Sequence, residues 1–330
     1  MKNKNNQNLK LILFIGHLAI DSIVRFKKIY KPTVGGTVSF GSLALRKYNN
    51  DVKIGIISNL GMKNFNKTLL KTFDNKNIDL RGLKWADTEN TNFILDYFNH
   101  TRTLTLKARS PNLKFEDIPE FYFENPPKII VLAPLCNEIS YDYTSQIIKN
   151  FPEAYIGIDL QGFIRKISDN GTVSYIYDEE LIANMRKIIN LIGDRLILKG
   201  SEIEMKLLSG HKNLYDVMES FNQFETGGIF IMTLGEAGSM IIKKGQKLLE
   251  IPAFKAKEVV DETGAGDVYL AIFLYEFIQS NMNWESVEKI AHLASAAASF
   301  LVEKKGPAGF KKKSEVIKRV KNKIYITHPK

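Results

Sequence analysis

Residues 259–274, VVDETGAGDVYLAIFL, place a carboxylate directly after a glycine-rich turn and before an apolar run that reads as a helix. Gly264, Ala265 and Gly266 make the turn, and Asp267 follows it. The first backbone N–H groups of a helix lack partners and lie at the positive end of its dipole, so this turn is a candidate phosphate site. Asp267 beside a phosphate suits a base that takes the proton from an attacking hydroxyl. The alternative is an ordinary first-turn acid that only favours the helix dipole.

Outside this stretch, short apolar runs alternate with segments of helical periodicity. The apolar runs lie at residues 11–16, 53–58, 128–133, 155–159, 196–199 and 228–233, and the helical segments at 39–48, 141–150, 178–190 and 213–224. Strand alternating with helix predicts a three-layer α/β fold, with a mostly parallel sheet and helices on both faces. We expect residues 1–10 to form a flexible tail and residues 11–330 to form a single domain.

Two regions, roughly 22–36 and 90–109, break this alternation with aromatic and β-branched residues at period two. The second predicts a hairpin that turns near Asn99 and His100. Together the two regions are expected to form a small β-sheet that projects from the main sheet as a lid. A further hairpin is expected to turn at Lys244 and Gly245, and the chain beyond Asp267 is expected to be helical.

The formal net charge of +10 on 330 residues favours anionic partners such as nucleic acid, a membrane surface or a phosphorylated substrate. The basic cluster KKKSEVIKRVKNK at residues 311–323 has no interleaved aromatic residue, which disfavours nucleic acid and favours a solvated helix. No apolar run approaches roughly 18 residues, so no membrane span is expected.

Cys136 is the only cysteine, which excludes an intramolecular disulfide and fits a cytoplasmic protein. Its apolar flank, PKIIVLAPLC, predicts a position in the core. The five histidines are scattered, and no pair has the spacing of a helical metal site. A metal centre built on histidine or cysteine is therefore not expected.

The motif DETGAGD at residues 261–267 resembles the D-T-x-G-A-G-D signature of the ribokinase-like carbohydrate kinases, also called the pfkB family. Other segments resemble further motifs of that family in the same order: GHLAID at 16–21, VGGTVSF at 34–40, KGSEIE at 199–204, TLGEAG at 233–238 and LASAAASF at 293–300. The resemblance runs from about residue 11 to residue 310. One glycine-rich turn is weak evidence, but ordered motifs along the whole chain are strong evidence.

The resemblance implies a magnesium-dependent kinase that uses ATP as its co-substrate and allows a monovalent cation as a further cofactor. It implies that Asp267 is the base and that the turn residues Gly264, Ala265 and Gly266 stabilise charge on the transferred group. The acceptor is expected at Asp21, Gly35, Gly36, Thr37 and Arg165. The nucleotide is expected at Ser201, Thr233, Gly235, Gly238, Thr263, Gly264, Gly266 and Ser295, with Ala296 on the helix that flanks the adenine. Glu204 is expected to organise magnesium through water, and the lid is a candidate surface for a homodimer.

Three departures from the family pattern bear on the site, that of Ser201 on the organisation of magnesium and that of Phe40 on the acceptor. Glu262 stands where the family usually has threonine or serine, and Ser201 replaces an asparagine, although Ser201 and Glu204 also form a capping-box pattern. Phe40 stands where an asparagine often follows the paired glycines, which suggests an apolar wall beside the acceptor. DLQGFIR at residues 159–165 is similar to inositol-kinase-like relatives.

The sequence thus leads us to expect phosphotransfer to a hydroxyl of a small sugar or polyol, with a cyclic polyol such as myo-inositol as the first choice. A nucleoside kinase or a keto-sugar acid kinase of the same fold is the alternative. A non-catalytic sensor that binds sugar or nucleotide is the second alternative, and the presence of Asp267 argues against it. Asp21 and the paired glycines also fit simple turns, so their assignment to the acceptor rests on the resemblance.

Overall fold

The structure is a computed structural model that describes residues 10–25, 28–29, 33–98 and 101–326. Its main sheet has nine strands. In spatial order they are β16 (Leu249–Ile251), β15 (Ser239–Lys243), β14 (Ile229–Thr233), β13 (Leu196–Ser201), β10 (Tyr155–Asp159), β9 (Ile129–Leu132), β1 (Leu11–Ile15), β5 (Lys53–Gly61) and β6 (Ile78–Ala86). The pairs that include β15 are antiparallel and the others are parallel. All six apolar runs are strands, and the hairpin at Lys244 and Gly245 joins β15 to β16.

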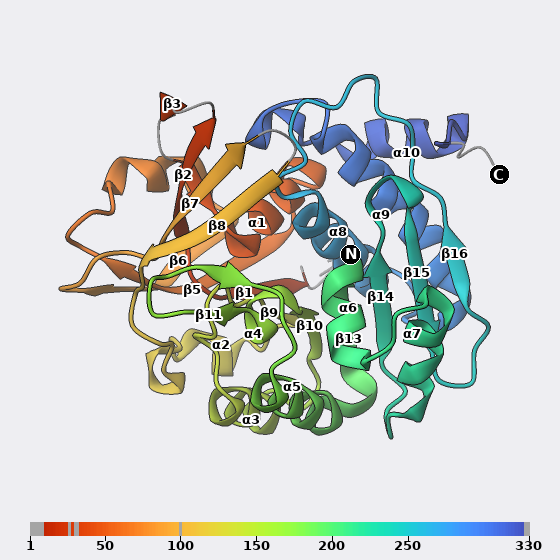
Figure 1. The fold of residues 1–330 in the computed structure, drawn as a ribbon, viewed down its shortest axis with the longest axis horizontal. Coiled ribbons are helices and arrows are strands. Elements are labelled where there is room, and N and C mark those ends of the chain that lie inside the picture. Colours follow the sequence, from red (N-terminus) through yellow and green to blue (C-terminus); the bar gives the residue numbers. More distant parts are fainter. Residues whose placement is uncertain (1–9, 26–27, 30–32, 99–100, 327–330) are drawn as a thin grey trace, which may run out of the picture.

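Helices cover both faces of this sheet, so the predicted three-layer fold is confirmed (Figure 1). Along β1 the side chains of Ile12 and Phe14 enter one core, while those of Leu13 and Ile15 enter the other. This alternation is the period-two pattern of a strand that is buried on both faces. The first core is closed by α1 (Thr37–Tyr48), α8 (Ala265–Gln279), α9 (Val287–Leu301) and α10 (Lys313–Asn322).

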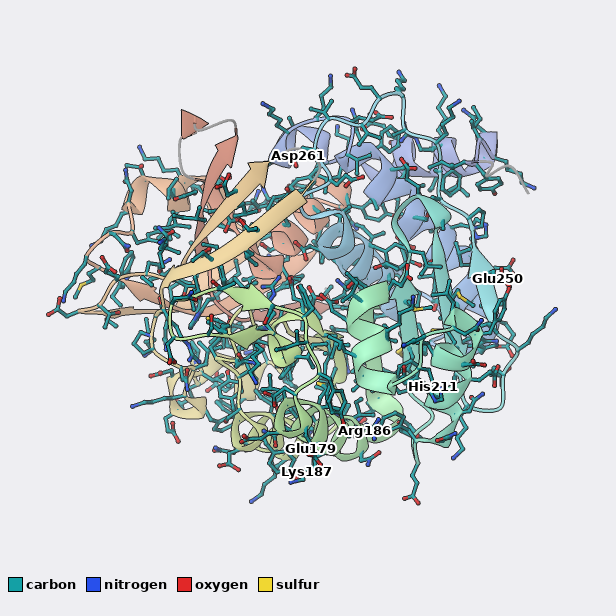
Figure 2. All side chains as sticks on the ribbon, viewed as in Figure 1. Glu179, Arg186, Lys187, His211, Glu250 and Asp261 are labelled. Atoms are coloured by element: carbon teal, nitrogen blue, oxygen red, sulfur yellow. The ribbon has the colours of Figure 1, made fainter. Side chains whose placement is uncertain are left out.

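The opposite face is covered by α3 (Tyr141–Asn150), α5 (Glu179–Ile192), α6 (Glu202–Ser209) and α7 (Leu214–Ser220), with the short helices α2 (Phe121–Glu124) and α4 (Gln161–Ile164). On α5, Ile182 and Met185 are buried, whereas Glu179 and Lys187 point outward (Figure 2). Helix α8 is different, because every residue from 268 to 278 is buried. It is packed between the sheet and its neighbours α1 and α9, which fixes the position of its N-terminus.

A second, smaller sheet lies beside the main one. It contains β2 (Ala19–Arg25), β3 (Lys28–Ile29), β4 (Thr33–Gly35), β7 (Asn92–Phe98) and β8 (Thr101–Ala108). The hairpin of β7 and β8 is confirmed, and its expected turn at Asn99 and His100 lies outside the described residues. A small hairpin of β11 (Lys166–Ile167) and β12 (Val173–Ser174) touches this sheet, where the Leu106 N–H donates to the Gly171 carbonyl at 2.8 Å.

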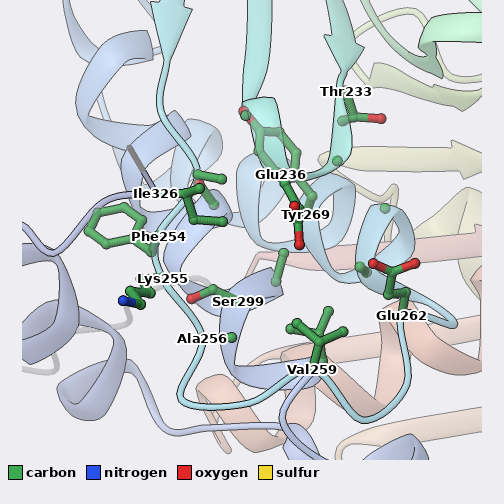
Figure 3. A pocket seen from close by; sticks show the side chains of 18 of the residues that line it. Thr233, Glu236, Phe254, Lys255, Ala256, Val259, Glu262, Tyr269, Ser299 and Ile326 are labelled. Atoms are coloured by element: carbon green, nitrogen blue, oxygen red, sulfur yellow. The ribbon is translucent and has the colours of Figure 1, made fainter. Parts of the chain in front are cut away.

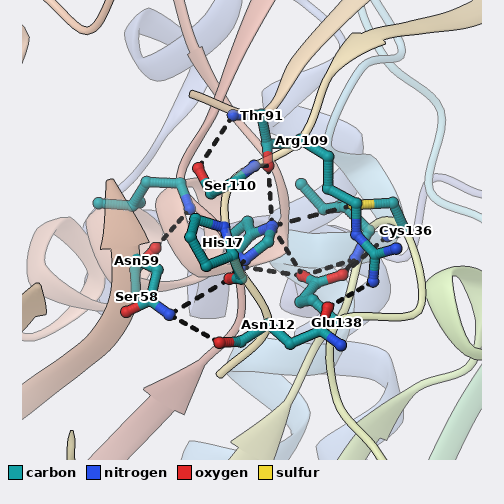
Figure 4. A network of polar contacts seen from close by, with 12 residues as sticks. His17, Ser58, Asn59, Thr91, Arg109, Ser110, Asn112, Cys136 and Glu138 are labelled. Atoms are coloured by element: carbon teal, nitrogen blue, oxygen red, sulfur yellow. Dashed lines mark hydrogen bonds and ion pairs between the residues drawn. The ribbon is translucent and has the colours of Figure 1, made fainter. Parts of the chain in front are cut away.

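A buried polar network joins the small sheet to the main one at His17 (Figure 4). His17 Nδ1 lies 2.8 Å from Thr91 Oγ1, and its Nε2 lies 3.0 Å from the Pro111 carbonyl. The Glu138 carboxylate accepts the backbone N–H groups of His17 and Cys136 at 3.0 and 2.8 Å. Because these partners come from both sheets, the network holds the base of the small sheet in place.

Cys136 is buried, as its sequence flank predicts. Its thiol lies within 4.8 Å of potential ligand atoms on His17 and Glu138, a grouping that the scattered positions of the histidines did not suggest. Burial and the nearby Glu138 carboxylate raise the pKa of the Cys136 thiol, so it stays protonated. The histidine and the carboxylate are already held by hydrogen bonds, which explains the cluster as structural.

Within the part of the chain that the structure describes, we find no helix with both the length and the apolarity that a bilayer crossing requires.

Candidate active site

The candidate site lies where the carboxyl ends of several parallel strands meet the N-termini of α1 and α8. The order of the strands turns at β1, since β5 lies on one side of it and β9 lies on the other. In open α/β sheets, ligands bind in the crevice outside such strand ends. Asp159 ends β10, Ser201 ends β13 and Thr233 ends β14, and all three positions open onto this crevice or lie directly beneath it.

The glycine turn before α8 fits the predicted phosphate site. Gly264 is the N-cap residue with φ of 84°, a conformation that favours glycine. A Cβ atom on Gly264 would lie 2.2 Å from the Phe40 ring, so a side chain is also excluded by packing. Gly266 has Lys199 Nζ 3.1 Å from the place of its missing Cβ. Asp267 follows in the first turn of the helix, whose N–H groups have no partner within the helix, although that of Ala265 donates to the Glu262 carbonyl at 3.1 Å.

Asp267 is held from below by a buried polar cluster. Its Oδ1 lies 2.8 Å from Thr37 Oγ1, and the same hydroxyl lies 2.6 Å from Asp159 Oδ2. Gln161 Nε2 donates to Thr37 Oγ1 at 2.8 Å and to Asp159 Oδ2 at 2.7 Å. Lys199 Nζ lies 2.7 Å from Asp159 Oδ1 as an ion pair. The cluster therefore combines two carboxylates and one cation, of which Asp159 and Lys199 are buried and Asp267 is partly exposed to the larger cavity.

This arrangement changes the protonation of its members. Burial, and next to it the charge of Asp159, raises the pKa of Asp267 to about 6. Burial also acts on Asp159, but the adjacent Lys199 ammonium outweighs it and holds the pKa of Asp159 below its ordinary value. The Asp159 carboxylate in turn helps to raise the pKa of Lys199, which stays charged. Asp267 is thus ionised at neutral pH and holds a proton more readily than an exposed aspartate.

Two cavities meet at the start of α8. The larger encloses about 760 Å³ beside the small sheet, and the smaller encloses about 570 Å³ beside α9. They share five lining residues: Thr233, Val259, Glu262, Ala265 and Gly266. A group bound at the N-terminus of α8 can therefore be reached from both cavities.

The larger cavity has polar groups at its floor and apolar walls. Its polar and charged lining includes Asp21, Gln161, Arg165 and Asp267. Its walls are formed by apolar side chains and one tyrosine: Phe93, Leu95 and Leu104 from the small sheet, with Leu135 and Tyr175. The apolar wall that was expected at Phe40 is thus formed by other residues.

Phe40 lies outside both cavities, so the expectation of an apolar wall at Phe40 is wrong. Its ring is buried under Gly264 and packs edge-on against Phe310, with ring centroids 6.2 Å apart. The reason is the orientation of α1, which turns Phe40 toward the core between α1 and α8.

The smaller cavity is lined largely by apolar side chains, among them those of Phe254 and Val259 (Figure 3). Phe254 and Tyr325 pack with ring centroids 4.8 Å apart, and Val302 and Tyr269 also line the space. Aromatic surfaces of this kind suit a planar heterocycle. Gly235 and Gly238, both with positive φ, form the turn at one side of this cavity.

The structure separates the residues expected to bind nucleotide. Thr233, Gly235, Gly238, Gly266 and Ser295 line the smaller cavity. The others, Ser201, Thr263 and Gly264, line the larger one. Ala296 faces the core and is fully buried, so its expected place beside a nucleotide is wrong. The residues of α9 that line the smaller cavity are Ser295, Ala298 and Ser299, and Val302 lines it just after the helix.

The residues expected to bind the acceptor also divide. Asp21, Gly36 and Arg165 line the larger cavity. Gly35 packs against Asp21, since a Cβ atom on Gly35 would lie 1.7 Å from the Asp21 carboxylate. Thr37 is buried and bonds to the two carboxylates described above, so it lies beneath the cavity and does not line it.

Arg165 and Glu204 both have protein partners at the cavity edge. The Arg165 guanidinium donates to Tyr175 Oη at 3.0 Å and to Gln161 Oε1 at 2.6 Å. The Ser201 N–H donates to Glu204 Oε2 at 2.8 Å, and the Glu204 N–H lies 3.4 Å from Ser201 Oγ, which confirms the capping box. Glu204 keeps its carboxylate at the cavity wall while it caps α6.

Sequence reasoning missed Asp159 and Lys199 as members of the site. The two residues are direct neighbours on the paired strands β10 and β13. Each is a charged residue that follows an apolar run, in YIGID and LILK. Because buried charges are normally paired, an aspartate and a lysine at the ends of two buried strands indicated that the strands are neighbours with these two residues side by side.

The chain matches the pfkB family of carbohydrate kinases over residues 45–313. It is 27% identical over 312 residues to a nucleoside kinase of Methanocaldococcus jannaschii, and the match covers 90% of this chain and 92% of that protein. Among solved structures, a fructokinase of Xylella fastidiosa with bound ATP has a TM-score of 0.77 at 16% identity, covering 95% of this chain and 99% of that one. A pyrophosphate-dependent kinase of the ribokinase family, complexed with a pyrophosphate analog and myo-inositol, has a TM-score of 0.71 at 20% identity, covering 93% and 99%.

The family match includes the glycine turn with its aspartate, together with Asp159 and Lys199 of the buried cluster. The protein is a kinase, and the chain belongs to the pfkB family of carbohydrate kinases.

Proposed function

We propose that the protein transfers the γ-phosphoryl group of ATP to a hydroxyl of a nucleoside. The observation that carries this proposal is the position of Asp267, which lines the larger cavity directly after Gly266, a residue that lines both cavities. The smaller cavity holds the nucleotide, whose base lies against the aromatic wall of Phe254 and Tyr325. The larger cavity holds the acceptor. The phosphoryl group then lies at the N-terminus of α8, between its donor and its acceptor.

The residues of the chain divide the work of this reaction. The Gly264, Gly266 and Asp267 amides stabilise charge on the transferred group, because preorganised donors need no rearrangement during the reaction. The expected Ala265 amide instead donates to the Glu262 carbonyl at 3.1 Å. Asp267 takes the proton of the acceptor hydroxyl as its oxygen bonds to phosphorus. Asp21 binds an acceptor hydroxyl. The small sheet closes over the acceptor as a lid, and this closure excludes water from the reaction.

Carboxylates that could hold magnesium line the larger cavity. Glu204, Asp261 and Glu262 are among its lining residues, and magnesium prefers oxygen ligands. Their oxygens do not lie together within direct ligand distance, so they would hold the ion through water. The Glu204 carboxylate accepts the Ser201 N–H at one oxygen and also has the Tyr175 hydroxyl as a hydrogen-bond partner. Magnesium, when bound, would neutralise negative charge on the phosphates of the nucleotide. We propose Glu204 as its organising residue through water, in keeping with the sequence resemblance.

The walls of the larger cavity support a nucleoside over a cyclic polyol as the acceptor. Each ring carbon of myo-inositol carries a hydroxyl, and a site for it must offer a polar partner on most sides. Here Phe93, Leu95, Leu104 and Leu135 present an apolar surface, which suits the flat face of a nucleobase. The similarity to an archaeal nucleoside kinase over nearly the full length supports the same choice.

An acceptor screen tests this proposal. The protein is incubated with ATP, magnesium and one candidate from each class: nucleosides, ribose, fructose, myo-inositol and a keto-sugar acid. ADP release is then measured. A nucleoside is expected to give a kcat/KM at least about tenfold above the other classes, because its base fills the apolar part of the cavity. Preference for myo-inositol or a simple sugar would overturn the acceptor class. Absence of acceptor-dependent ADP release with every class would favour the sensor.

A substitution in the smaller cavity tests the place of the nucleotide. Ala298 on α9 lines this cavity, and a tryptophan there fills the space without removing a hydrogen bond. Ala298→Trp is expected to weaken the binding of a non-hydrolysable ATP analogue by about tenfold or more in calorimetry, because the base loses its wall. Lys289→Trp, exposed on the same helix and outside the cavity, is the matched control and should bind as the unchanged protein does. Equal affinities in both variants would place the nucleotide elsewhere.

A further inference from the structure

One hydroxyl group stands between two carboxylates of the site, the buried Asp159 and the cavity-lining Asp267. Thr37 Oγ1 lies 2.6 Å from Asp159 Oδ2 and 2.8 Å from Asp267 Oδ1. A hydroxyl has a single proton and donates it to one acceptor at a time. Both carboxylates therefore compete for the same donor.

The two competitors differ in how many other donors they have. Asp159 has Gln161 Nε2 at 2.7 Å on one oxygen and Lys199 Nζ at 2.7 Å on the other. Asp159 therefore remains held when the Thr37 proton turns away. Asp267 accepts a hydrogen bond from the Thr37 hydroxyl, and among the described residues no lysine or arginine forms an ion pair with it. An ionised Asp267 thus gains more from the hydroxyl than Asp159 does.

The charges around the cluster keep this difference in place. Lys199 is buried beneath the glycine turn, and its ammonium is paired with Asp159, which holds Asp159 in its ionised form. Gln161 is held in turn by the Arg165 guanidinium at its Oε1, so its amide nitrogen stays directed at Thr37 and Asp159. Asp159 and Gln161 are therefore held in place around Thr37, whereas the Thr37 hydroxyl can rotate between the two carboxylates.

We propose that Thr37 is a positioning residue whose hydroxyl follows the charge of Asp267. Before the reaction, the Thr37 hydroxyl donates to ionised Asp267 and orients it toward the acceptor. As the acceptor oxygen bonds to phosphorus and the bond from phosphorus to ADP breaks, the acceptor proton moves to Asp267. The resulting carboxylic acid no longer needs the donor, and the Thr37 hydroxyl turns to Asp159. No proton leaves Thr37 in this sequence. The inference rests on the proposed role of Asp267 as the base.

The test compares two substitutions at one position. Thr37→Val keeps the shape of the side chain and removes the hydroxyl, whereas Thr37→Ser keeps the hydroxyl. Thr37→Val is expected to lower kcat by about 10–100-fold, the effect of one lost hydrogen bond to a charged group, with the KM for ATP nearly unchanged. Thr37→Ser is expected to retain most of kcat. Equal losses in both variants, or an unchanged kcat in Thr37→Val, would overturn the proposal.

A double substitution separates this inference from the function on which it rests. If Thr37 acts through Asp267, adding Thr37→Val to Asp267→Asn should hardly change the residual rate, since residues that act as a unit are not additive. A further full loss in the double variant would show that Thr37 acts on something else. Near-normal turnover of Asp267→Asn alone would overturn the base, and with it the inference. Loss of turnover in Asp267→Asn together with normal turnover in Thr37→Val would overturn only the inference.

Discussion

Asp267→Asn is expected to lower kcat by about 10²–10⁴-fold, the range for the loss of a general base. The substitution keeps the size of the side chain and its polar contacts, but it removes the group that accepts the proton of the acceptor hydroxyl. The loss corresponds to roughly 3–5 kcal/mol of barrier. The affinity for nucleotide should change far less, because the helix N-terminus that binds the phosphate is intact. Steady-state kinetics and calorimetry on the same preparation measure both quantities.

The same variant is expected to be at least as stable as the unchanged protein near pH 8. The pKa of Asp267 is raised to about 6 by burial and by the nearby Asp159 charge, so its ionised form costs the fold free energy above that pH. This free-energy cost decreases as the pH falls through about 6 and is gone below the ordinary pKa of an exposed aspartate. Thermal melting at pH 8 should therefore favour Asp267→Asn, and the difference should shrink at pH 5.

A purely structural first-turn acid would behave in the opposite way. Its removal would cost about 0.3–1 kcal/mol of stability and leave turnover nearly intact. Glu288 provides the control, because it is an exposed acid in the first turn of α9 and lies outside both cavities. Glu288→Gln should show this behaviour. Near-normal kcat in Asp267→Asn would remove the mechanism proposed above.

Lys199→Met is expected to destabilise the protein by about 3–5 kcal/mol, the usual result of removing one partner from a buried ion pair. Lys199 Nζ lies 2.7 Å from Asp159 Oδ1, and the side chains of the two residues are 7% and 0% exposed. Without the ammonium, the Asp159 and Asp267 carboxylates face each other with no buried cation between them. The free energy of unfolding in urea measures the loss.

Two comparisons make this second prediction specific. Lys63 pairs with Asp87 at 4.0 Å, with both side chains more than half exposed, so Lys63→Met should cost less than about 1 kcal/mol. Adding Asp159→Asn to Lys199→Met removes the uncompensated charge and should restore part of the stability. If Lys199→Met unfolds at the same urea concentration as the unchanged protein, the ion pair does not stabilise this fold.

Features that depend on neighbours in the chain were predicted well. The apolar runs became strands, and the glycine turn at residues 264–266 opens α8 as the sequence indicated. The capping box of Ser201 and Glu204 is present because both partners lie within one helical turn. These features follow from backbone hydrogen bonding and from side-chain periodicity, which a short segment already contains.

Features that depend on the rotation of a helix were predicted less well. Phe40 and Ala296 both lie in the expected helices, but both face the core. A sequence motif gives the position of a residue along a helix, whereas the face that meets a cavity depends on how that helix packs against its neighbours. Ala298, two positions beyond Ala296, lies at the cavity wall.

The sequence by itself determined the layered α/β fold, the phosphate turn and the aspartate that follows it, because each is written in local pattern and motif order. Only the tertiary structure decided what surrounds that aspartate. Thr37, Asp159, Lys199 and Asp267 come from four separate segments and meet only when α1, β10, β13 and α8 are packed together. Their charges and the pKa of Asp267 are set by distance and burial, and these are properties of the packed molecule that no single segment carries.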